Sequence, residues 1–156
     1  MPPGVIARVA ADSLASRLGL QPGDELLTIN HRPLRDAIDV QFYAAEEQLT
    51  LQVRRQDQER LLQAQRRYDE PLGLEFTQPT FDIDIRRCNN RCDFCFVAQM
   101  PPGLRPSLYI RDDDYRHSFL FGNYVTLTNL TEEDWQRIEE QRLSPLYILS
   151  LIHISE

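Results

Sequence analysis

The sequence predicts two domains of different class. An α+β domain over residues 1–78 is followed, over residues 79–156, by the beginning of an α/β domain built on parallel strands. The first half carries short strand patterns separated by turns that contain Gly and Pro, whereas the second half runs strand, long loop, helix and strand. The pattern changes at residues 77–79, where we place the boundary, and 156 residues suffice for two small domains.

Local signals define the elements of the first half. Ser13 is a suitable N-cap for a helix that Gly19 ends, and Asp36 is a suitable N-cap for a second helix. The strand patterns are rich in β-branched residues or alternate apolar and polar side chains. We expect strands at residues 5–9, 26–29, 49–53 and 61–68.

One long motif in this half is specific. The stretch from Gly4 to Asn30 contains G-L-Q-P-G-D-E-L-L-T-I-N and resembles the strand–helix core of PDZ domains over about residues 4–55. The resemblance implies binding of a protein or peptide partner, whose C-terminus PDZ domains hold in a Gly-Leu-Gly-Phe-like loop before this core. A stretch at the other end of the domain has two open interpretations. It could supply the peptide-binding loop, as in a circularly permuted PDZ domain, or it could be only a strand that closes the sheet. The residues concerned are Leu72, Gly73, Leu74 and Phe76.

The second half predicts a strand at residues 81–85, where apolar and acidic residues alternate, and another at residues 146–149. Between them, Thr131 caps a helix, and Asp134 at the third helical position completes a capping box. We expect Trp135 to lie on the inner face of that helix, together with Ile138 and Leu143.

The three cysteines of the chain fall within eight residues, as Cys88, Cys92 and Cys95 in the pattern C-x3-C-x2-C. Thiolates are soft ligands that suit iron–sulfur clusters and zinc. A 4Fe–4S cluster is normally held by four ligands, so three cysteines leave one iron open for a cofactor or substrate. A structural zinc site is the alternative, and it would need a fourth ligand such as His117 or His31.

The cysteine spacing, with an aromatic residue at Phe94, resembles the signature of radical S-adenosylmethionine (SAM) enzymes. The resemblance implies a parallel βα partial barrel in which SAM binds the open iron and is cleaved reductively. Phe94 and Asn90 would lie next to the cluster ligands. For Asn90, a purely structural role in capping the loop is at least as well supported as a role near the cluster. Flanking motifs such as S-L-Y-I-R-D-D-D-Y-R resemble the DUF512 family, which joins a PDZ-like domain to a radical SAM-like core, and Ala98 departs from that family's pattern.

Three adjacent carboxylates, Asp112, Asp113 and Asp114, have two open interpretations. They could bind a divalent cation or face a substrate. They could equally form a solvated turn that pairs with Arg111 and Arg116. Adjacent residues seldom point the same way in regular structure, so at most two carboxylates would act together.

Composition narrows the possible partners and the cellular location of the protein. The net charge is −7 and the basic residues are scattered, which argues against nucleic acid as a partner. We find neither a membrane-spanning segment nor a signal peptide, and expect a cytoplasmic protein. The end of the sequence, about residues 149–156, does not continue the expected family pattern. We expect a truncated fragment with a non-native tail, in which cluster binding occurs without turnover and SAM cleavage requires the full-length enzyme.

Overall fold

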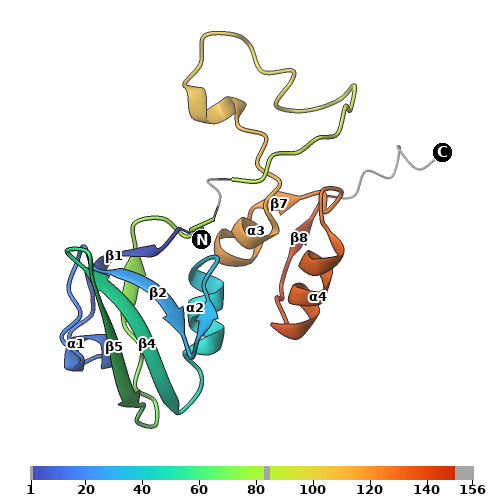
Figure 1. Cartoon of the computed structure of the whole chain (residues 1–156). Coiled ribbons are helices and arrows are strands. Elements are labelled where there is room, and N and C mark those ends of the chain that lie inside the picture. The colour runs from blue at the N-terminus through green and yellow to red at the C-terminus, as the bar shows by residue number, and fades with distance from the viewer. Residues whose placement is uncertain (1, 83–84, 150–156) are drawn as a thin grey trace. The chain divides into compact units, whose positions relative to one another are not determined.

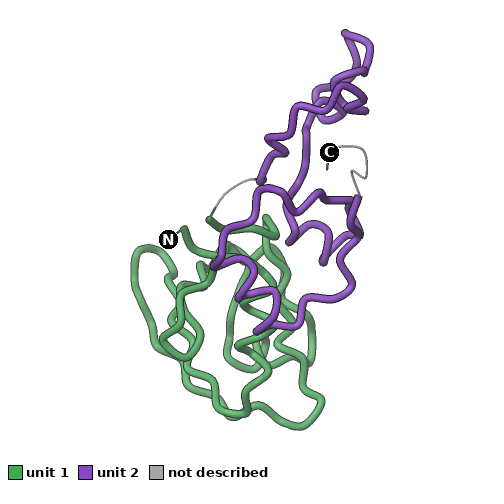
Figure 2. The backbone as a smooth tube through the Cα atoms, turned by 90° about the vertical axis from the view of Figure 1, so that its right-hand side faces the viewer, with its two compact units in different colours: residues 1–84 green, residues 85–156 purple. Residues whose placement is uncertain are grey.

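The computed structural model describes residues 2–82 and 85–149 (Figure 1). The chain divides into two compact units, residues 1–84 and residues 85–156, which Figure 2 colours separately. None of the described helices is both long enough and apolar enough to cross a membrane.

The first unit is a mixed α/β fold around an antiparallel sheet. Its strands lie in the order β5-β4-β2-β1-β6, and β3 pairs with β2. The α+β class predicted for this half is therefore confirmed. The elements are β1 (Gly4–Val9), α1 (Leu14–Arg17), β2 (Glu25–Ile29), β3 (Arg32–Pro33), α2 (Ala37–Tyr43), β4 (Gln48–Arg55), β5 (Gln58–Gln65) and β6 (Leu74–Phe76).

Caps and turns fix these elements where the sequence places them. The Ser13 side chain accepts a hydrogen bond from the Ser16 amide at the start of α1, and the Asp36 carboxylate accepts from two amides at the start of α2. Asn30 and His31 both have positive φ, at 49° and 63°, in the tight β2–β3 turn. Local hydrogen bonding thus sets the boundaries, and the sheet then buries the apolar side chains between them.

The core of the first unit extends beyond its last strand. Leu26, Ile29 and Leu51 are fully buried at its centre. Phe81 also belongs to this core, where its ring packs edge-on against Phe76 with centroids 4.9 Å apart. Phe81 is a bend residue and not part of a strand.

The strand expected at residues 81–85 is accordingly not formed at Phe81, Asp82 or Ile85, while residues 83 and 84 lie outside the described residues. Residues 79–84 group with the first unit.

The second unit contains a parallel βαβ arrangement. Strand β7 pairs with β8 in parallel, with Tyr124 opposite Tyr147, and α4 lies between the two strands in the sequence. A strand–helix–strand crossover of this type is the repeating unit of parallel sheets. The elements are η1 (Pro106–Tyr109), α3 (Tyr115–Phe121), β7 (Tyr124–Val125), α4 (Glu132–Glu140) and β8 (Tyr147–Ile148).

The capping box predicted for α4 is confirmed, but its predicted inner face is wrong at one position. Thr131 and Asp134 exchange side-chain and backbone hydrogen bonds at the start of the helix. Trp135 is 42% exposed, whereas Asp134 and Arg137 are buried. The buried face is polar because both of these side chains bind partners elsewhere in the second unit.

Candidate cysteine site

A short pairing of two segments positions the first cysteine. The Cys88 amide donates to the Arg111 carbonyl at 2.8 Å, and the Asp113 amide donates to the Arg86 carbonyl at 2.9 Å. An isolated antiparallel bridge joins Arg87 to Asp112 between them. The start of the cysteine loop is therefore tied to the segment that precedes α3.

The other two cysteines lie in consecutive turns. The Cys95 amide donates to the Cys92 carbonyl at 3.1 Å, and the Gln99 amide donates to the Cys95 carbonyl at 3.1 Å. All three cysteines are free thiols and are partly buried. All three cysteines line one pocket.

This cysteine pocket has a volume of about 500 Å³ and lies within the second unit. Aromatic and aliphatic side chains from the loop and from its neighbours form much of its wall. Phe94 is half exposed at the edge of the pocket. The lining residues are Cys88, Cys92, Phe94, Cys95, Phe96, Val97, Ile110, Arg111, Asp112, Asp113, Gly122, Asn123, Tyr124, Thr126 and Leu149.

The pocket gathers three soft donors, Cys88, Cys92 and Cys95. Across residues 2–82 and 85–149, no three His, Cys, Asp or Glu side chains converge closely enough to hold one metal ion. A structural zinc site needs four ligands that converge on one point. In a 4Fe–4S cube each cysteine binds a different iron, so three thiols supply ligands for three of the four irons.

Neither histidine expected as the fourth ligand of a zinc site lines the pocket. His117 is not a lining residue, and its Nδ1 lies 3.3 Å from Asp112 Oδ2. That hydrogen bond and the nearby carboxylate raise the pKa of His117 above its ordinary value. His31 lies in the β2–β3 turn of the first unit.

The surroundings of Cys95 favour its thiolate form. The backbone amide of Ala98, assisted by that of Val97 and by the Arg111 guanidinium, lowers the pKa of the Cys95 thiol below its usual range. The thiolate is the form that binds metal. Cys95, which the motif spacing predicts to be a ligand, is therefore also favoured as a ligand by its electrostatic surroundings.

Asn90 anchors the cysteine loop to the end of β7. Its side-chain amide donates to Thr128 Oγ1 at 2.7 Å and to Thr126 Oγ1 at 3.3 Å. Both donors of the amide are therefore directed at threonine hydroxyls. Sequence reasoning missed the two threonines, because neither residue type nor spacing marks them.

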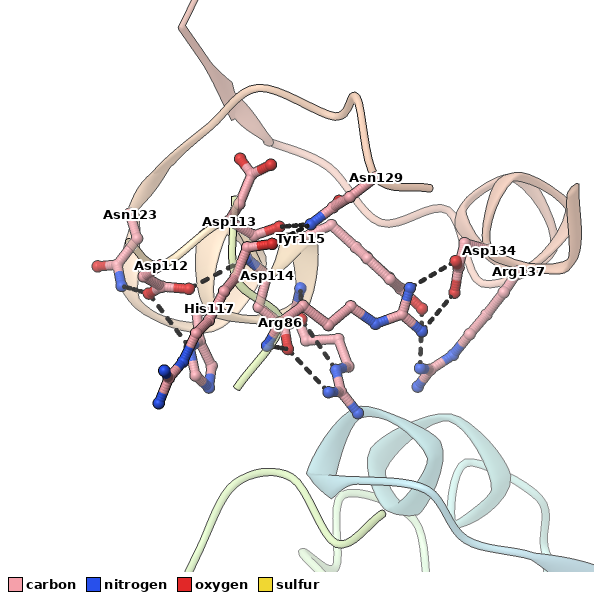
Figure 3. A network of polar contacts seen from close by, with 12 residues as sticks. Arg86, Asp112, Asp113, Asp114, Tyr115, His117, Asn123, Asn129, Asp134 and Arg137 are labelled. Atoms are coloured by element: carbon pink, nitrogen blue, oxygen red, sulfur yellow. Dashed lines mark hydrogen bonds and ion pairs between the residues drawn. The ribbon is translucent and has the colours of Figure 1, made fainter. Parts of the chain in front are cut away.

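The three adjacent aspartates lie in a network of polar contacts (Figure 3), and the solvated-turn interpretation is wrong for two of them. Asp113 and Asp114 are only 1% and 0% exposed. Asp114 caps α3 and pairs with the Arg116 guanidinium at 2.8 Å, which leaves it no part in the cysteine pocket. The expected pairing with Arg116 is confirmed for this one carboxylate.

The other two aspartates border the cysteine pocket. Asp113 accepts hydrogen bonds from the amide and the hydroxyl of Thr126, at 2.5 and 2.7 Å. Asp112 accepts from Asn123 Nδ2 at 2.7 Å and contacts His117 (Figure 3). Each carboxylate therefore has its own partners, and together they join the loop before α3 to the end of β7.

A second group of buried charges holds α4 in place (Figure 3). The Arg86 guanidinium donates to both oxygens of Asp134, at 2.5 and 2.8 Å. The Arg137 guanidinium donates to the Tyr115 hydroxyl at 3.1 Å. Burial raises the pKa of Asp134, but Arg86 and the Thr131 hydrogen bonds outweigh it and lower the pKa to about 2.

The candidate peptide loop is placed at the edge of the first sheet. Residues Leu74–Phe76 form β6, which pairs antiparallel with β1 as a closing strand. Gly73 has φ +74°, and a Cβ at this position would lie 2.2 Å from Ser13 Cβ. The side chains of Leu72, Leu74 and Phe76 pack against the core. Peptide binding by these residues stays a prediction.

Comparison with known proteins agrees with this two-part organisation. Residues 66–155 match the model of a radical SAM-like domain, and residues 5–55 match the model of a PDZ domain. No curated protein matches the chain. The first match covers more than half of the 156 residues and includes the cysteine pocket. The chain belongs to the radical SAM-like domain family.

Proposed function

We propose that the chain binds a 4Fe–4S cluster through Cys88, Cys92 and Cys95, as the cluster-binding part of a radical SAM enzyme. One observation carries this proposal: the three thiols of the C-x3-C-x2-C motif line a single pocket. Membership of the radical SAM-like family supports the same assignment.

When bound, such a cluster supplies one electron for the reductive cleavage of SAM at the iron that has no cysteine ligand. The protein's own residues prepare the site. The lowered pKa of Cys95 favours its thiolate form, which is the ligating form. The rings of Phe94 and Phe96 and the side chain of Val97 give the pocket an apolar border.

The narrower DUF512 assignment and the partial barrel belong to this proposal. The parallel pairing of β7 with β8 around α4 supports a βα barrel, because that unit is the repeat from which such barrels are built. The three free thiols support a reducing compartment, and we place the protein in the cytoplasm. The substrate class of the enzyme is a separate question from cluster binding.

Anaerobic reconstitution with iron and sulfide tests the proposal. We expect about four iron and four sulfide per chain, and loss of both in the Cys88→Ala, Cys92→Ala and Cys95→Ala variants. The exposed Ser107→Ala variant is the matched control and should keep the wild-type iron content. Tight stoichiometric zinc binding with no uptake of iron would contradict the proposal.

A second function is favoured by the PDZ match and by the edge position of β6. We propose that the first unit binds an extended peptide with a free C-terminus, by adding it to the sheet or through the loop at Leu72 and Gly73. A peptide library screened against the full chain should select sequences by their C-terminal residues. Equal binding of peptides with free and amidated C-termini would count against this function.

A further inference from the structure

Arg111 contacts the cysteine loop through both its backbone and its side chain. Its carbonyl accepts the Cys88 amide at 2.8 Å. Its guanidinium Nη2 donates to the Asn90 carbonyl, between the first and second cysteines. Arg111 is also a lining residue of the cysteine pocket. One side chain therefore links the loop, the pocket and the segment before α3.

The positive charge of Arg111 is not neutralised by an ion pair with any carboxylate of the described residues. The nearest carboxylates in the sequence have other partners. Asp112 binds Asn123 and His117, while Asp113 binds the Thr126 amide and hydroxyl. Arg111 thus presents a positive charge at the wall of the pocket that the three cysteines also line.

We propose that Arg111 is a positioning residue of the cysteine site, which orders the loop through the Asn90 carbonyl and holds a positive charge against an anionic iron–sulfur cluster. This inference rests on the proposed function and adds a residue that the cysteine motif does not contain. Arginine suits both tasks, because its guanidinium stays charged and offers several donors in a fixed plane.

The charge has a predictable effect on the cluster. Three thiolate ligands make the bound cluster anionic, and reduction adds one more negative charge. A nearby cation therefore stabilises the reduced form more than the oxidised form, and net charge is one of the factors that set cluster potentials. Removal of the Arg111 charge should make the cluster harder to reduce.

The test compares Arg111→Gln, Arg111→Lys and Arg91→Gln in the full chain. Arg91 lies in the same loop, but its side chain is exposed, and solvent screens exposed charges. An EPR-monitored redox titration gives the midpoint potential of each reconstituted variant. We expect Arg111→Gln to lower the ratio of reduced to oxidised cluster about tenfold at a fixed potential, or about 59 mV for one electron.

Arg111→Lys should recover most of that shift, and Arg91→Gln should change the ratio less than threefold. Equal shifts in Arg111→Gln and Arg91→Gln, or no shift in Arg111→Gln, would overturn the inference while the proposed function stands. If the wild-type chain takes up no iron, the proposed function fails instead.

Amide hydrogen exchange of residues 88–95 in the cluster-free chain tests the ordering role by itself. It should speed up several-fold in Arg111→Gln and not in Arg91→Gln. Unchanged exchange would overturn the ordering role of Arg111.

Discussion

The buried pair between Arg86 and Asp134 allows the most quantitative prediction for the second unit. Asp134 is 5% exposed, caps α4 and accepts both bonds from the Arg86 guanidinium. Its pKa falls from 3.8 to about 2, and each pKa unit corresponds to about 1.4 kcal/mol. Asp134→Asn should therefore lower the free energy of unfolding by about 2–3 kcal/mol, with the unpaired Arg86 charge as part of the cost.

The pH dependence of this loss follows from the sign of the shift. A carboxylate whose pKa is depressed in the folded state stabilises the fold fully above its unfolded pKa, and the contribution disappears as the pH falls through the folded value. The difference between wild type and Asp134→Asn should be constant from pH 7 to about pH 5. It should then shrink between pH 4 and pH 2.

Urea denaturation followed by tryptophan fluorescence measures this effect, because the only tryptophan, Trp135, is adjacent in α4. Glu133→Gln is the control: it removes a carboxylate from the same helical turn, but Glu133 is exposed. Its effect should stay near 0.5 kcal/mol. The reasoning is refuted if Asp134→Asn costs no more than Glu133→Gln, or if the difference does not change below pH 4.

Two further predictions concern other parts of the chain. Gly73→Ala should destabilise the first unit by about 3 kcal/mol in urea denaturation, because a Cβ there would overlap Ser13 at positive φ. Gly19→Ala in the same unit, also at positive φ but with open space around it, should cost about 1 kcal/mol. Asp112→Asn should lower the pKa of His117 in an NMR titration, since the hydrogen bond to Asp112 is the main cause of its raised value. The Asp112–His117 pair stabilises the fold below pH 6.5, and this contribution is lost as the pH rises, so it should be smaller in the variant. An unchanged His117 titration would show that Asp112 does not cause the raised pKa.

The first unit was largely predictable because its boundaries depend on local chemistry. Ser13 and Asp36 cap helices at the positions their side chains favour, and the alternation at residues 49–53 corresponds to the buried face of β4. A cap or a two-residue period needs only neighbouring residues. Phe81 was misassigned because its place in the core depends on contact with Phe76 and Gly4, which no local pattern contains.

The second unit was less predictable because long-range charge pairs decide its packing. Periodicity placed Trp135 on the buried face of α4, but Arg86, 48 residues away from Asp134, draws that carboxylate inward instead. The three cysteines were identified from spacing alone. Arg111 was not, because its role depends on the backbone pairing that brings residue 111 to Cys88.

The most direct test of the cluster assignment is the EPR spectrum of the reduced, reconstituted chain before and after addition of SAM. Three cysteine ligands leave one iron of the cube open, so SAM should change the g values of the reduced cluster. A cluster signal that SAM leaves unchanged, or a chain that binds zinc through Cys88, Cys92 and Cys95 and takes up no iron, would contradict the account.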